Sequence, residues 1–189
     1  SSSAASDVYK RQAVLESVRK EVRQIADRAA TFGVALLGEH ERTVSHELEV
    51  EVDHVVRVVR IDGVVRGLLT DRDDPCVVDV RFSRPKPVMR LGLALQLAVL
   101  QLDDPERDWA GVLVCRAAAT GKAPEGVRLR IAGSGDSRRR HAEALLGMAV
   151  QLFEWAQRDA VPFFPQVSTP LSVDDCLLYT SDAADEEDS

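Results

Sequence analysis

The chain has 189 residues, 45% of them hydrophobic, and a formal net charge of −7, with 24 Lys+Arg against 31 Asp+Glu. This length suits one domain with a normal core. Three cysteines without a CxxC pair exclude a disulfide framework, and no apolar run of about 18 residues predicts a membrane span. We therefore expect a soluble cytoplasmic protein, in which any DNA contact depends on a local basic patch because the chain as a whole is acidic.

The two ends differ from the rest of the chain. The runs SSSAASDVYKRQ and CLLYTSDAADEEDS resemble translated sequencing-adapter sequence at the ends of metagenomic gene fragments. We expect residues 1–12 and 176–189 to be non-native tails that pack poorly, the alternative being native disordered tails, and residues 13–175 to form one domain. Without these tails the chain holds 22 Lys+Arg and 25 Asp+Glu, a net charge of −3.

The first half predicts a helix followed by strands. Apolar residues recur at spacings of three and four up to Gly33, which indicates a helix; they are Val14, Val18, Val22, Ile25 and Ala29. Strict alternation over residues 48–52 predicts a half-buried strand. Apolar runs on both sides of Asp62-Gly63 predict a β-hairpin with its turn at that pair.

The second half alternates strands with helices. In chain order these are a strand at 76–82, a buried helix at 89–102, strands at 110–119 and 126–132, and a long helix that Asp136 or Ser137 caps and that ends before Pro162. The buried stripe expected on the long helix is Ala142, Leu145, Leu146, Ala149, Leu152, Phe153 and Ala156. This order predicts an α/β (α+β) fold with a mostly antiparallel sheet flanked by helices.

The order helix, three strands, helix, strand resembles the PD-(D/E)XK nuclease core, a mixed sheet flanked by helices. Such a site needs two carboxylates for Mg²⁺ and a lysine near the attacking water. The matching positions are Asp62, then Asp79 and Arg81 in VVDVRF, with Gln96 on the following helix. Arginine in place of lysine is a poor proton acceptor, so the motif is degenerate and we expect no catalytic residue here. The alternative is that Asp62 serves only as a turn residue and the group is structural.

A longer succession of motifs resembles the C-terminal part of the RecC family, the gamma subunit of exodeoxyribonuclease V. It comprises VRIDGVVRG, VVDVRFSRPKPVMRLGLALQLAVLQL, a strand pair, a long helix and VPFFPQVS, over roughly residues 15–168. The resemblance implies an inactive nuclease-like domain of the RecBCD helicase–nuclease, with RecB-type and RecD-type subunits and DNA as partners and no membrane contact. It also implies that ATP and Mg²⁺ act in the partner subunits, with no cofactor in this chain.

This resemblance predicts a non-catalytic role in DNA repair by recombination, in which the domain scaffolds partner subunits and guides unwound strands. Two alternatives stay open: an active Mg²⁺-dependent RecB-type nuclease that tolerates arginine, and a pure protein-interaction module. Helicase-like domains encoded upstream would support the non-catalytic role over both alternatives.

Two basic groups are candidates for DNA contact, and one aromatic pair is a candidate for partner contact. The basic residues are Arg84, Lys86 and Arg90 around a proline turn, and Arg138, Arg139 and Arg140 at the start of the long helix. A solvated surface is the competing interpretation of both groups. Phe163 and Phe164, between two prolines, either pack on the core or anchor a partner subunit.

Other chemistries lack their motifs. Gly121-Lys122 has no upstream glycine of a phosphate-binding GxxxxGK[ST] loop, and the four histidines lack zinc spacing.

Overall fold

The computed structural model describes residues 2–34, 38, 40–158 and 173–180. Its elements are α1 (Ser2–Thr31), β1 (His40–Val52), β2 (Val55–Leu69), β3 (Cys76–Arg81), α2 (Pro87–Asp103), β4 (Ala110–Cys115), β5 (Glu125–Ile131), α3 (Gly135–Arg158), the 3-10 turn η1 (Asp174–Cys176) and β6 (Leu177–Thr180). The predicted order of helices and strands is confirmed from α1 to α3. No helix among the described residues is long and apolar enough to cross a membrane.

The strands form one six-stranded mixed sheet in the order β1-β2-β3-β4-β5-β6. β3 and β4 are parallel, with Cys76 opposite Ala110 and Arg81 opposite Cys115. All other neighbouring pairs are antiparallel. A parallel pair needs a long crossover, and α2 supplies it between β3 and β4. The predicted α+β class with a mostly antiparallel sheet is therefore confirmed.

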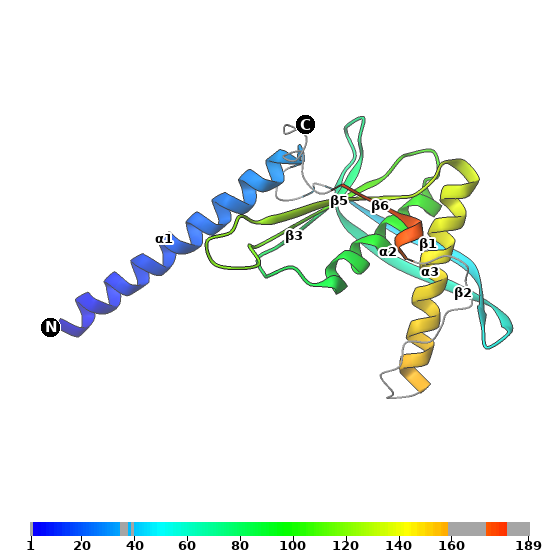
Figure 1. Cartoon of the computed structure of the whole chain (residues 1–189), viewed down its shortest axis with the longest axis horizontal. Helices are drawn as coiled ribbons and strands as arrows, with labels where there is room; N and C mark the ends of the chain where they lie inside the picture. The colour runs from blue at the N-terminus through cyan, green and yellow to red at the C-terminus, as the bar shows by residue number, and fades with distance from the viewer. Residues whose placement is uncertain (1, 35–37, 39, 159–172, 181–189) are drawn as a thin grey trace.

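Helices cover both faces of the sheet (Figure 1). On one face α2 and α3 bury Leu97, Leu100 and Leu145 against the sheet. On the other face the C-terminal part of α1 buries Ile25 and Ala29. Every residue of β4 is buried, because helices pack on both of its faces, and its sequence AGVLVC is correspondingly apolar throughout.

The β1–β2 hairpin turns at Asp53-His54, whose φ angles are +51° and +63°. Positive φ at both central residues is the signature of the type I′ hairpin turn. Asp62-Gly63, where the sequence predicts the turn, lies within β2 instead. Asp62 is opposite Ser45 and Gly63 is opposite Val44. The prediction was wrong because a short-range turn signal was outweighed by the pairing of two long strands.

A β-bulge interrupts β2 at Gly67. On β1, His40 pairs with Leu68 and the next residue, Glu41, pairs with Arg66, so that Gly67 has no residue opposite. Gly67 has φ +77°, a left-handed conformation that glycine adopts without steric cost. The extra residue allows both Val65 and Leu68, three positions apart, to face the core beneath α2 and α3.

Both predicted tails contain regular structure. α1 begins at Ser2 rather than near residue 14, and its residues from 3 to 20 are all exposed along a helix that extends beyond the sheet (Figure 1). At the other end, β6 pairs with β5, and Cys176 and Leu177 are buried. The expectation that the second tail packs poorly is wrong for these two residues, whose backbone completes the ladder beside Ile131. The proposed domain boundaries stay a prediction.

The buried stripe of α3 is shorter than predicted. Ala142, Leu145, Leu146 and Met148 are buried, whereas Phe153 is 65% exposed. The C-terminal half of α3 instead meets the β1–β2 hairpin through polar groups. Gln151 Nε2 donates to the Glu51 carbonyl at 2.6 Å, and Arg57 binds Glu154 at 3.2 Å. Apolar spacing continues into this half, where Phe153 lines an apolar groove beside the hairpin and is not buried in the core.

Candidate nucleic-acid interface

The two acids of the nuclease-like motif lie on neighbouring strands but on opposite faces of the sheet. Ile61 packs on the core beneath α2 and α3, so the side chain of the next residue, Asp62, lies on the other face. There the pKa of Asp62 is held below its ordinary value, first by a hydrogen bond from Ser45 and then by Arg60 at 3.0 Å. Asp79 alternates with Val77, which faces α2 and α3.

Asp79 is bound by Arg81 on the same face of β3. Arg81 Nε donates to Asp79 Oδ1 at 2.7 Å and Nη2 donates to Oδ2 at 3.2 Å, a bidentate pair. The Asp79 side chain is 18% exposed. Both of its oxygens therefore accept hydrogen bonds from the Arg81 guanidinium.

Gln96 lines the same groove as Asp62, and Asp79 does not line it. Gln96 lies on α2 and lines this apolar groove of about 630 Å³ between the β1–β2 hairpin and helices α2 and α3, together with Val44, Ile61 and Phe153. Among the described residues no group of three or more His, Cys, Asp or Glu side chains is placed to hold a metal ion.

The parallel pairing of β3 and β4 brings two loops to one edge of the sheet. The carboxyl ends of parallel strands meet at the same edge, which is where open α/β sheets commonly bind ligands. The loop 82–86 follows β3, and the loop 116–124 follows β4. The Arg116 backbone N–H donates to the carbonyls of Arg81 and Ser83, both at 3.1 Å, and so ties the loops together.

Three of the predicted DNA-binding residues surround this edge. Arg84 and Lys86 are exposed in the loop before α2, and Arg90 is exposed in the first turns of that helix. None of the three forms an ion pair with another described residue. Phe82, in the same loop, is 58% exposed. Exposed cations beside an exposed aromatic ring are the combination that binds single-stranded nucleic acid.

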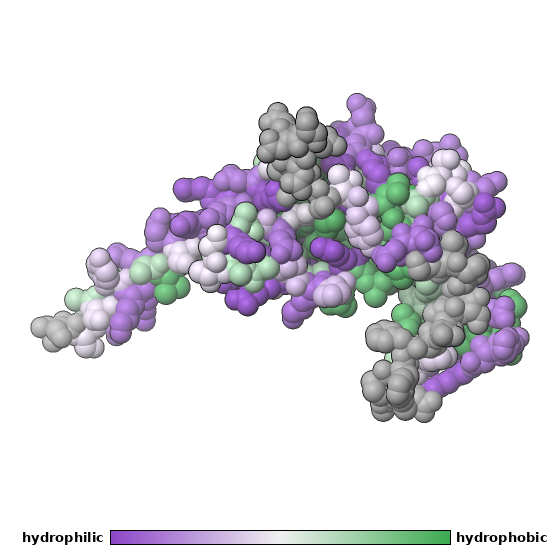
Figure 2. All heavy atoms as spheres, viewed as in Figure 1, coloured by the Kyte–Doolittle hydropathy of each residue, from purple (hydrophilic) through white to green (hydrophobic). Residues whose placement is uncertain are grey.

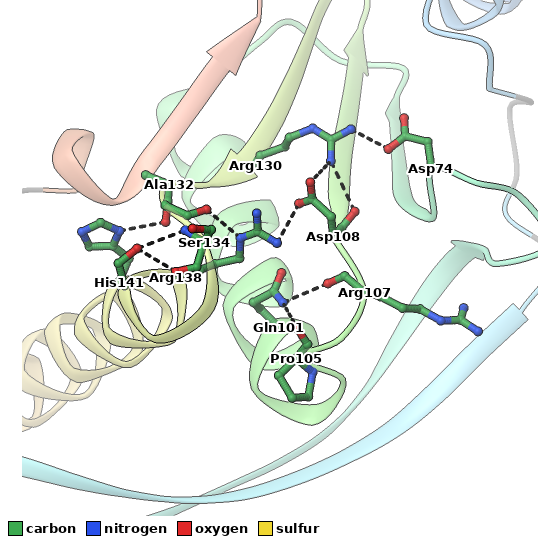
Figure 3. Close-up of polar contacts among 12 residues, drawn as sticks. Asp74, Gln101, Pro105, Arg107, Asp108, Arg130, Ala132, Ser134, Arg138 and His141 are labelled. Carbon is green, nitrogen blue, oxygen red and sulfur yellow. Dashed lines mark hydrogen bonds and ion pairs between the residues drawn. The ribbon is translucent and has the colours of Figure 1, made fainter.

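The arginines at the start of α3 have different surroundings (Figure 3). Arg138 Nε donates to the Gly133 carbonyl at 2.9 Å, and its guanidinium binds Asp108 at 3.2 Å. Arg139 pairs with Glu143 at 3.0 Å. Arg140 is exposed, with no ion pair to another described residue. Arg138 thus has a structural role, and Arg140 remains the accessible cation of this group.

α3 begins at Gly135, and the side chain that bonds its start is that of Ser137, one of the two predicted capping residues. The Ser137 hydroxyl donates to the Ser134 carbonyl at 2.9 Å and accepts from the Ser134 backbone N–H at 3.0 Å. The Ser137 hydroxyl thus makes both bonds to the Ser134 backbone, which is the half of a capping box that the third helical residue supplies.

Asp74, in the loop before β3, joins the same network. It accepts hydrogen bonds from Arg128 and Arg130 of β5. Figure 3 shows Arg130 between Asp74 and Asp108, the second of which it binds at 3.2 Å. Burial raises the pKa of Asp74. The two arginines together lower this pKa by more than burial raises it, so the net pKa lies below the ordinary value of 3.8.

We expect Asp74→Asn to lower the free energy of unfolding by about 1–3 kcal/mol at pH 7, because two half-buried guanidinium groups lose a charged acceptor. A depressed pKa in the folded state stabilises the protein above the unfolded-state value and loses this effect as the pH falls. The difference between wild type and variant should therefore shrink below about pH 4. Urea denaturation at pH 7, 5 and 3 measures it. Asp73→Asn, at the exposed neighbour, is the control, and an equal loss in both variants would contradict the network.

Sequence reasoning missed Arg116 and Lys122, which lie at the same edge as Arg84. Both residues follow the apolar strand β4 within a few positions, and this spacing alone predicts that they lie in a loop. Their convergence with Arg84 depends on β3 and β4 being parallel neighbours, which local patterns do not reveal. The predicted partner-interface residues Phe163 and Phe164 lie outside the described residues.

The family model for the RecC C-terminal domain matches residues 11–172. The match covers most of the chain, which therefore belongs to the RecC C-terminal domain family, that of the RecC-type subunit of the RecBCD complex. Among solved structures, one described as "Crystal structure of SSO0001" is 17% identical with a TM-score of 0.32, and the alignment covers 79% of this chain and 65% of that chain. No curated protein matches the chain.

Proposed function

We propose that this chain is a non-catalytic, nuclease-like domain of a RecC-type subunit. In the RecBCD complex it scaffolds RecB-type and RecD-type subunits and guides unwound DNA strands during repair of double-strand breaks by recombination. The complex works in the cytoplasm, and the chemistry of ATP and Mg²⁺ belongs to the partner subunits. The family match over residues 11–172 carries this proposal.

The edge formed by the loops after β3 and β4 supports the DNA contact. Arg84, Lys86 and Arg90 lie together there, exposed and without ion pairs to described residues, in a chain whose net charge is −7. Phosphate contacts from such cations supply most of the affinity for nucleic acid. Phe82 adds a surface on which an unpaired base can stack, which favours a single strand over a duplex.

The geometry of the acids supports the absence of catalysis. A two-carboxylate metal site requires both groups on one face within reach of one ion. Asp62 and Asp79 lie on opposite faces, and Arg81 binds both oxygens of Asp79. This permanent cation competes with a metal ion for the carboxylate.

The exposed part of α1 supports a scaffolding role. Val14, Leu15 and Val18 are each more than 50% exposed on a helix that stands away from the sheet, and apolar side chains are visible along it (Figure 2). Apolar groups in such a position are typical of a protein interface. Phe163 and Phe164 are proposed as additional partner anchors.

We expect the purified chain to bind single-stranded DNA and leave it intact. Replacing Arg84, Lys86 and Arg90 together by alanine should weaken binding roughly 100-fold at about 0.1 M salt and lower the salt slope by about 2, since each lost phosphate contact on a single strand changes the slope by about 0.7. Fluorescence anisotropy across a salt series measures both. The matched control removes Arg57, Arg60 and Arg66, three arginines of β2 that carboxylates already neutralise.

The same samples, incubated with Mg²⁺ or Mn²⁺, test catalysis. The DNA should stay intact with the wild type, with Asp79→Ala and with Arg81→Lys. Cleavage by the wild type that is lost in Asp79→Ala would establish an active nuclease instead. Equal affinity of the two triple variants would remove the proposed DNA contact from this edge.

A further inference from the structure

A second feature of the β3–β4 edge is a small pocket walled by three segments that are distant in sequence. Gln24 and Ile25 of α1 form one wall, Arg84 of the loop after β3 forms another, and residues 116–124 after β4 close the third side. Its volume is about 200 Å³. Pockets for whole small molecules usually measure about 300–1,000 Å³, so this one suits a single functional group.

The pocket is positively charged. Arg84, Arg116 and Lys122 line it against one acid, Glu21. Glu21 pairs with Arg116 at 3.5 Å, with both side chains more than 40% exposed, so this pair is solvated and open to exchange. Arg84 and Lys122 form no ion pair with another described residue. The pocket therefore has an excess of two positive charges, whereas the chain as a whole has a net charge of −7.

The remaining groups are also suited to an anion. Thr120 contributes a hydroxyl and Gln24 an amide to the lining. Arginine forks bind the tetrahedral oxygens of phosphate in a bidentate manner, and lysine adds a point charge with three donors. The pocket adjoins the surface of Phe82, Lys86 and Arg90 through Arg84, which belongs to both.

We propose that this pocket binds one internucleotide phosphate of a DNA strand, with Arg84, Arg116 and Lys122 as the phosphate ligands. The inference rests on the proposed function for the identity of the strand, and it adds a defined site and two residues to that function. The neighbouring exposed surface then accommodates the nucleotides on either side of the bound phosphate.

The test uses the complete chain and a single-stranded oligonucleotide without terminal phosphates. Arg116→Ala/Lys122→Ala should weaken binding roughly 25-fold at about 0.1 M salt and lower the salt slope by about 1.4. Arg60→Ala/Arg66→Ala, which removes the same charge from β2, is the matched control and should cost little. Arg116→Lys/Lys122→Arg keeps both charges and should restore most of the affinity. Thermal melting of each variant verifies folding.

Neutral methylphosphonate linkages in the oligonucleotide identify the contacted group. They should weaken binding by the wild type more than by Arg116→Ala/Lys122→Ala, because the variant has already lost the contact. Adding a terminal phosphate should not restore the variant. Equal sensitivity of both proteins to methylphosphonate, or a loss no greater than in the β2 control, would overturn the pocket assignment. If the triple variant at Arg84, Lys86 and Arg90 still weakens binding in that case, the proposed function stands without the pocket. A wild type that binds no DNA would refute both.

Discussion

Replacing Trp109 by alanine is expected to lower the free energy of unfolding by about 3–5 kcal/mol, the range for truncating a fully buried aromatic side chain. Trp109 has no exposed surface and precedes β4 in the core beneath α2 and α3. The guanidinium groups of Arg42 and Arg107 lie 5.4 and 5.9 Å from its ring centre, so cation–π attraction is lost together with the packing.

Urea denaturation measures the Trp109 effect through the midpoint and the slope. Trp109→Phe is the comparison, because it keeps an aromatic ring near the two arginines and leaves a smaller cavity. We expect it to lose clearly less stability than the alanine variant. A similar loss in both, or a loss below about 1 kcal/mol in Trp109→Ala, would show that the ring is not packed as described.

Gly67→Ala is expected to have an effect on stability of similar size, from two sources. A non-glycine residue at φ +77° costs about 1–3 kcal/mol in backbone strain. A Cβ at this position would also lie 2.6 Å from the Val78 carbonyl oxygen, so that β2 and β3 must separate locally. A second cost of about 1–3 kcal/mol follows from this overpacking.

Gly63 offers a matched control on the same strand. A Cβ at Gly63 meets no atom within 4 Å, and its φ is not positive. Gly63→Ala should therefore leave stability unchanged or raise it by a few tenths of a kcal/mol through the unfolded chain. Denaturation curves of the two variants measure the difference. Equal stability of the two would contradict the bulge at Gly67.

Local patterns predicted the elements of this fold better than their connections. The spacing around Val22 and Ile25 predicts α1, and the apolar run of residues 89–102 predicts α2, because each helix buries a face that its own periodicity reveals. The hairpin turn was misplaced because Asp62-Gly63 is a preferred turn pair, whereas the true turn at Asp53-His54 contains no glycine. The pairing that decides between them spans two long strands.

In the candidate interface too, local patterns predicted some residues, whereas the surroundings of others depend on tertiary pairing. Arg84, Lys86 and Arg90 were predicted as candidates because prolines mark an exposed loop there, and their contact with DNA stays a prediction. Arg138 met the same local criteria, but Asp108, thirty positions away, binds its guanidinium. Lys122 was passed over because its motif is incomplete. Its proximity to Arg84 results from tertiary pairing, which no spacing along the chain records.

The bulge at Gly67 also decides which face of the sheet carries Asp62. In an uninterrupted strand, positions 62 and 68 would share a face, and Leu68 faces α2 and α3, as Asp79 does. One inserted residue reverses this relation and places the two carboxylates on opposite faces of the sheet. A single bulge can therefore decide whether two acidic side chains of neighbouring strands share a face, with neither side chain changed.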